Sequence, residues 1–124
     1  MVEKLQRILT QIKNEKGTVN LFMIIKMENL TDKWTVYIAA PWITQLNRNE
    51  MFTYIRGFLL SNLSNEEQAS IGGIGLIENT NHMVDLFTRD IRVTDGFVRL
   101  QDTAINGYKI HDAYIFESNV PSNT

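Results

Sequence analysis

The chain has 124 residues and a mass of 14.3 kDa, a length typical of one domain. Hydrophobic residues make up 44% and charged residues 21%, which excludes an extended disordered protein. Twelve basic and fourteen acidic side chains leave a net charge of −2, so no overall basic field indicates a nucleic-acid partner. Cysteine is absent, which excludes disulfides, thiol nucleophiles and thiolate zinc sites.

The N-terminal segment is charged and lacks the apolar core of a signal peptide. The longest strongly apolar run, Leu21–Ile25, is too short to span a bilayer. We therefore expect a cytoplasmic protein without membrane contact. No repeat or linker divides the chain, so residues 1–118 are expected to form one compact domain. Residues 119–124 have no apolar pattern and are expected to form a flexible tail.

The N-terminal part of the chain predicts a helix and a hairpin. Apolar residues at helical spacing predict a helix over 2–15, with Gly17 as its stop. Apolar residues of both parities then predict a strand over 19–27 that is covered on both faces. A polar turn leads into a strand over 34–40, which Pro41 closes, and the short connection favours antiparallel pairing.

The middle of the chain predicts two helices and a strand. From Asn47 or Asn49 the apolar period becomes 3.6, which predicts a helix to residue 63. The sequence Ser64-Asn65-Glu66-Glu67 has the pattern of a capping box, so a short helix is expected to begin there. A strand opened by glycines follows over 71–77. These glycines precede a strand and lack the dinucleotide-binding spacing, so they indicate tight packing rather than phosphate binding: Gly72, Gly73 and Gly75.

The C-terminal part predicts a helix over about 81–89 and strands over 91–93, 97–101 and 108–117. We therefore expect an α/β fold of mixed α+β character. Its sheet is a mixed one of about five to six strands, with a right-handed crossover, antiparallel additions and flanking helices.

Asp112 interrupts the apolar pattern of the last predicted strand. Four aromatic or aliphatic residues share its parity: Tyr108, Ile110, Tyr114 and Phe116. A regular strand would therefore place a carboxylate on an apolar face, where it must be hydrogen-bonded, paired or protonated. The structural alternatives are a bulge at His111-Asp112 or a pairing with a Lys, an Arg or a Tyr hydroxyl. The functional alternative is a buried acid.

The carboxyl ends of the two predicted parallel strands are the best place for a ligand, because ligands collect there in open sheets with crossovers. Five side chains with indole, hydroxyl, amide or imidazole groups follow these strands: Trp42, Thr44, Asn79, Asn81 and His82. Each strand also leads into a helix, whose N-terminus offers backbone donors. The alternative interpretation is that the polar residues cap these helices and Trp42 packs as a plug.

No catalytic, metal or cofactor site is predicted. His82 and His111 are far apart, and no nucleophile motif occurs. The first hypothesis is therefore a non-catalytic protein-interaction module that forms a homodimer, with an unknown protein partner, because the apolar content is large for the length. The alternative is a small-ligand or nucleotide-binding domain, or a weakly marked hydrolase, with its site near Trp42 and Asn79–His82. Nucleic-acid binding is not expected.

Overall fold

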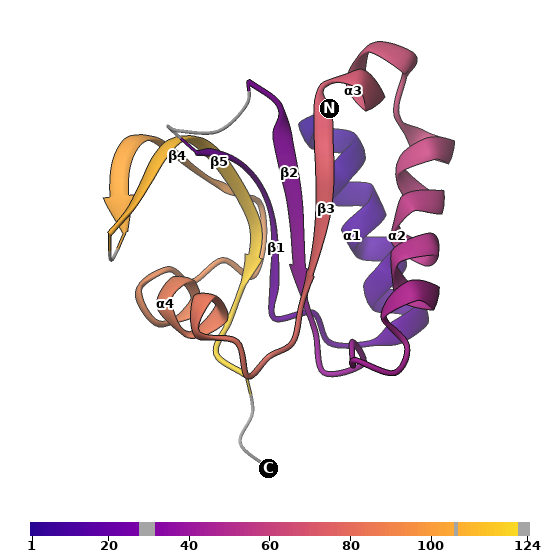
Figure 1. Ribbon diagram of the computed structural model, residues 1–124, viewed down its shortest axis with the longest axis horizontal. Coiled ribbons are helices and arrows are strands. Elements are labelled where there is room, and N and C mark those ends of the chain that lie inside the picture. The colour runs from indigo at the N-terminus through magenta and orange to yellow at the C-terminus, as the bar shows by residue number, and fades with distance from the viewer. Residues whose placement is uncertain (28–31, 106, 122–124) are drawn as a thin grey trace.

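The computed structural model describes residues 1–27, 32–105 and 107–121 (Figure 1). Within these ranges the elements follow one another as α1 (Val2–Lys16), β1 (Leu21–Met27), β2 (Trp34–Ala39), α2 (Arg48–Asn62), α3 (Asn65–Ala69), β3 (Ile71–Ile77), α4 (His82–Asp90), β4 (Val98–Ile105) and β5 (Tyr108–Ser118).

The strands form one mixed sheet in the order β3-β2-β1-β5-β4. The central strand β1 runs antiparallel to both β2 and β5, and β4 runs antiparallel to β5. β3 is parallel to β2, and α2 and α3 lie in the crossover between them. The predicted mixed sheet with flanking helices is confirmed, and the fold belongs to the α+β class.

Helices cover both faces of the sheet (Figure 1). α1 and α2 lie side by side on one face of β1, β2 and β3, while β4 and β5 curl around α4 on the opposite face. Each layer has its own apolar core, one centred on Ile8, Ile55 and Phe22, the other on Phe87 and Met23. None of the helices in the described ranges is long and apolar enough to cross a membrane.

β1 separates the two cores and is buried on both sides, as its apolar residues of both parities predict. Phe22 and Ile24 pack into the core under α1 and α2, whereas Met23 and Ile25 pack into the core under α4. All four are at most 1% exposed. Because both faces of β1 are buried over residues 21–25, a shift of its register by one residue would exchange the contents of the two cores.

Two C-terminal predictions differ from the structure. The strand predicted over 91–93 is reduced to one isolated bridge between Val93 and Ser118, because α4 extends to Asp90. The Ile91 carbonyl also accepts a hydrogen bond from Ser118 Oγ, at 2.6 Å. The strand predicted over 97–101 is longer and is β4 itself, although most of its side chains are exposed. The dipeptide Asn106-Gly107, which precedes the last strand, is a sequence typical of a tight turn. Asn106 lies outside the described residues, and Gly107 has a φ of 91°, as such turns require.

Candidate functional site

Trp42 and Thr44, two of the predicted ligand residues, lie in the turn after β2. The Trp42 indole Nε1 donates to the Thr18 carbonyl oxygen at 2.9 Å, and its ring meets Tyr54 edge-on with centroids 6.4 Å apart. The Thr44 amide donates to Asn47 Oδ1 at 2.9 Å, and the Asn47 amide lies 3.3 Å from Thr44 Oγ1. Both predicted residues are therefore engaged in holding the turn that precedes α2.

The other three predicted ligand residues follow β3. Asn79 Nδ2 donates to Asn20 Oδ1 at 2.8 Å, and Asn81 Oδ1 accepts from the Met83 amide at 2.9 Å and so caps α4. His82 is the first residue of α4 and is exposed. This loop shares one end of the sheet with the turn after β2, because β2 and β3 are parallel. Each amide at this rim nevertheless bonds to a residue of the fold.

Asn79 belongs to a chain of polar side chains at this end of the sheet. Asn20, which is 3% exposed, donates through Nδ2 to Asn119 Oδ1 at 2.6 Å, and the Asn119 amide donates to the Asn20 carbonyl at 2.9 Å. Asn119 Nδ2 lies 3.1 Å from Glu117 Oε2, and Lys13 Nζ lies 2.7 Å from Glu117 Oε1. Asn119 is thus hydrogen-bonded into the fold, although the sequence places it in the tail over 119–124.

Asn79 Oδ1 ends this chain as a buried acceptor without a hydrogen-bond partner in the described part of the protein. A buried amide oxygen without a donor is destabilising by about 1–3 kcal/mol. It is a single unsatisfied atom in a network whose other members are hydrogen-bonded. It does not by itself define a ligand site.

Asp112 stands beside a bulge in β5. Lys26 of β1 pairs with Asp112 and Met27 pairs with Ile110, so His111 has no partner on β1. The extra residue exchanges the faces of β5 at this point. Before the bulge, the even-numbered Ile110 packs in the core under α4. After it, the odd-numbered Ala113 and Ile115 pack in that core.

Asp112 is also ion-paired. Arg99 donates to both of its carboxylate oxygens, from Nη2 at 3.0 Å and from Nε at 3.2 Å, and its guanidinium lies 4.9 Å from the centre of the Tyr114 ring. These hydrogen bonds raise the pKa of Arg99 above its usual value. The structure therefore contains both the bulge and the basic partner that were the alternatives to a functional acid.

No metal centre is found in the ranges that the structure describes, where no three His, Asp or Glu side chains gather closely enough to hold an ion. His111 Nδ1 lies 3.3 Å from Asp102 Oδ1, but both side chains are more than half exposed. An exposed pair of this kind contributes little to binding or stability.

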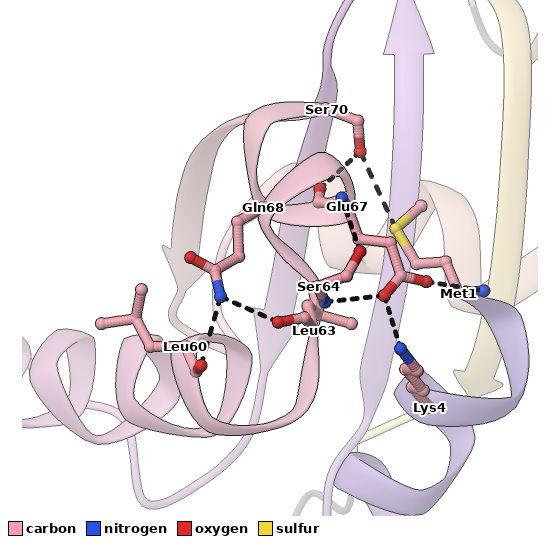
Figure 2. Close-up of polar contacts among 8 residues, drawn as sticks. All are labelled: Met1, Lys4, Leu60, Leu63, Ser64, Glu67, Gln68 and Ser70. Carbon is pink, nitrogen blue, oxygen red and sulfur yellow. Dashed lines mark hydrogen bonds and ion pairs between the residues drawn. The ribbon is translucent and has the colours of Figure 1, made fainter.

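A polar cluster around Glu67 joins α1 to α3 (Figure 2). Glu67 Oε1 accepts from Lys4 Nζ at 2.7 Å and from the Ser64 amide at 2.8 Å, and Oε2 lies 3.1 Å from the amino group of Met1. The Glu67 amide donates to Ser64 Oγ at 3.2 Å, which completes the predicted capping box. The hydrogen bond from Lys4, followed by that from the Ser64 amide, lowers the pKa of Glu67 to about 2. This cluster positions α3 at the start of β3.

An open apolar groove of about 210 Å³ lies between α2 and β3. Its lining comes from one side of α2, from α3 and from the first half of β3: Phe52, Arg56, Leu59, Leu60, Gln68 and residues 71–74. Phe52 is 41% exposed and Leu60 is 49% exposed, although both are large and apolar. The groove therefore exposes side chains that soluble proteins usually bury.

The residues of this groove are absent from the predicted site. The buried side of α2 comprises Met51, Ile55 and Leu59, and the apolar stripe in the sequence points to that side. Phe52 and Leu60 lie outside this stripe, and that departure is the signal in the sequence that could have indicated a second apolar surface.

No protein-family model, curated protein or solved structure matches this chain. The function must therefore be argued from the residues of the chain itself.

Proposed function

We propose that this protein is a non-catalytic protein-interaction module that binds an extended polypeptide segment along the free edge of β3. The observation that carries the proposal is the character of that edge. β3 has seven residues, Ile-Gly-Gly-Ile-Gly-Leu-Ile, with no charge and no proline, and in the described part of the sheet it pairs with β2 alone. An uncharged edge strand is a template for pairing with another chain.

The opposite edge of the sheet is more strongly protected than β3, in which the Arg48 guanidinium binds one backbone group, the Leu76 carbonyl, at 2.8 Å. β4 carries Arg99 and Asp102, and Asp102 has a φ of 45°, a conformation that a regular added strand does not follow. Charged residues and local distortions are the usual means by which sheet edges avoid pairing. The contrast supports β3 as the edge that serves recognition.

Of the three glycines of β3, Gly73 favours a close approach, whereas Gly72 lies against the Lys33 side chain and Gly75 against the Tyr37 ring. A Cβ atom added to Gly73 would meet nothing within 4 Å, so the strand is open at this position. Glycine within a strand often marks a site where another backbone comes near. The exposed Phe52 and Leu60 beside the edge would cover the side chains of the added segment.

The expected homodimer is one form of this proposal. A two-fold axis beside β3 would pair the two edges antiparallel, and Phe52 of each copy would meet Leu60 of the other. The same axis would bring the two Arg56 side chains together, and a contact between like charges is unfavourable. We therefore rank a segment of another protein ahead of a second copy as the occupant.

The cytoplasmic location and the absence of a nucleic-acid partner remain part of the proposal. They are supported by the lack of cysteine and by the net charge of −2.

Selection from a displayed random-peptide library tests the proposal. Wild type is expected to enrich peptides with alternating apolar residues, and Leu60→Lys is expected to reduce their binding at least about tenfold by placing a charge in the groove. The matched control is Leu46→Lys, because Leu46 is fully exposed and does not line the groove. Failure to enrich any peptide, or an equal loss of binding in both variants, would show that β3 is not a recognition edge.

The mass of the protein at micromolar concentration, measured by sedimentation equilibrium, decides between the two occupants. A monomer is expected. A stable dimer that Leu60→Lys dissociates and Leu46→Lys does not would assign the β3 edge to a second copy.

A further inference from the structure

We infer that the groove beside β3 selects an extended segment with a carboxylate side chain between two apolar ones. The inference rests on the proposed function and names the chemistry of its partner. Arg56 is the reason, because it lines the groove on α2 between Phe52 and Leu60 and is exposed. Its guanidinium makes no ion pair or hydrogen bond with any residue that the structure describes.

Among the described residues, Arg56 shares its lack of a partner with Arg7 and Arg92, which do not line the groove, and three other arginines bond within the fold. Arg48 donates to the Leu76 carbonyl at 2.8 Å, Arg99 binds Asp112, and Arg89 is paired with Asp85. The other polar side chain in the groove, Gln68, donates to the Leu60 and Leu63 carbonyls and carries no charge. The groove therefore presents one cation among apolar surfaces, and its electrostatic complement is an anion.

The spacing of the three α2 residues fits an added strand. Phe52, Arg56 and Leu60 are four residues apart, which corresponds to about 6 Å per step along a helix axis. Side chains on one face of a strand are two residues apart, which corresponds to about 6.7 Å per step. Because α2 runs alongside β3 (Figure 1), three successive side chains of the added strand would face Phe52, Arg56 and Leu60 in turn.

This match defines the partner as an extended segment with the pattern apolar-x-acidic-x-apolar. Its backbone pairs with β3, its two apolar side chains contact Phe52 and Leu60, and its carboxylate accepts hydrogen bonds from the Arg56 guanidinium. An arginine can bind a carboxylate through two parallel N–H donors, which fixes register as well as charge. Register needs such a device here, because the backbone bonds alone are the same in every register.

Three synthetic heptapeptides test the inference by fluorescence anisotropy. Each has the sequence Thr-Val-Thr-X-Thr-Val-Thr with blocked ends and Glu, Gln or Lys at the central position. Wild type is expected to bind the Glu peptide about threefold to tenfold more tightly than the Gln peptide, and to bind the Lys peptide most weakly. The advantage of the Glu peptide should diminish as the salt concentration rises.

Charge reversal provides the decisive comparison. Arg56→Glu should invert the order, so that the Lys peptide binds best, whereas the control Arg7→Glu should leave the order of wild type unchanged. Arg7 is exposed on α1, far from the groove lining in sequence, and makes no ion pair in the described ranges. Melting temperatures of both variants verify that they fold.

The outcomes separate the inference from the proposed function. If wild type binds all three peptides equally and Leu60→Lys abolishes binding, the carboxylate preference is overturned while strand addition stands. If no peptide binds and the chain is a stable dimer through β3, the inference is overturned because a second copy occupies the groove. Inversion of the order by Arg56→Glu, without inversion by Arg7→Glu, establishes the carboxylate preference.

Discussion

Gly57 and Gly75 occupy opposite environments. Gly57 lies inside α2, and a Cβ atom added there would meet nothing within 4 Å, so the close packing expected for a mid-helix glycine is absent. Gly75 lies in β3, opposite Tyr37 of β2, and an added Cβ would collide with the Tyr37 ring. One glycine therefore lowers the stability of its helix without a packing reason, and the other makes room for an aromatic ring.

We predict that Gly57→Ala raises the free energy of unfolding by about 0.5–1 kcal/mol, because alanine is the better helix former and loses less backbone entropy on folding. Gly75→Ala should lower it by about 1–3 kcal/mol, because the Tyr37 ring must move. Urea unfolding followed by circular dichroism measures both. Destabilisation by Gly57→Ala would mean that a side chain approaches Gly57 after all.

At the scale of the element, α3 depends on its cap. It is five residues long and has no buried residue, so neither its length nor its packing stabilises it. Its capping box and the Lys4 ion pair on Glu67 supply the local order (Figure 2). α3 in turn leads directly into β3, so the cap positions one end of the proposed recognition edge.

Glu67→Gln should make the protein less stable at neutral pH, and the difference from wild type should depend on pH. The carboxylate has a pKa of about 2 in the folded chain and an ordinary value of 4.5, so its contribution is complete above about pH 4.5. The contribution falls as the pH drops from about 4.5 towards 2, because the carboxylate then becomes protonated. Melting temperatures measured across this range for both proteins test the prediction. A difference that stays constant down to pH 2 would contradict it.

The capping box and the bulge in β5 show which features the sequence could predict. Ser64 and Glu67 interact with residues three positions away, so their pattern is complete within one short segment. The bulge at His111 exists only relative to β1, because the extra residue is defined by the pairing of Lys26 and Met27. The sequence indicates a bulge at this position because Asp112 interrupts the apolar pattern. It does not indicate Arg99 as the partner of Asp112, because Arg99 is on another strand.

The sequence pattern does not indicate the groove beside β3, because this surface also depends on contacts between distant segments. Phe52, Arg56 and Leu60 become a surface only where α2 lies beside an unpaired strand, and the strand order is a property of the whole sheet. The helices α1 and α2 and the doubly covered β1 follow from periodicity, and the hairpin follows from its short connection, so each is set within a short stretch of the chain. The groove depends on contacts between segments that are distant in the chain, and these contacts cannot be predicted from the local pattern of a single sequence.

At the scale of the whole molecule, the amide chain Asn79–Asn20–Asn119 joins the ends of three strands. Asn20 immediately precedes β1, Asn79 follows β3 and Asn119 follows β5. Asn119 also donates to the Val19 carbonyl and to Glu117. In the part of the chain that the structure describes, the last hydrogen-bonded residue at this end of the sheet is therefore Asn119, one residue beyond β5.

Deletion of residues 119–124 is expected to lower the free energy of unfolding by about 1–3 kcal/mol, because the buried Asn20 amide loses its acceptor. Deletion of residues 120–124 alone should change it by less than about 0.5 kcal/mol, since Val120 is 46% exposed. Denaturant unfolding of the two truncated chains beside wild type makes the comparison. Equal stabilities of the two truncated chains would show that Asn119 does not stabilise the fold and belongs to the flexible tail predicted from the sequence.

The placement of the two tryptophans has a consequence for spectroscopy. Trp34 and Trp42 both pack against the core under α1 and α2, and the core under α4 has no tryptophan among its members. Tryptophan emission therefore reports on only one of the two layers. A partial opening in which α4 leaves the sheet would be silent in that signal, whereas amide exchange of α4 would record it. A probe placed at Phe87→Trp, in the core under α4, would make the second layer visible.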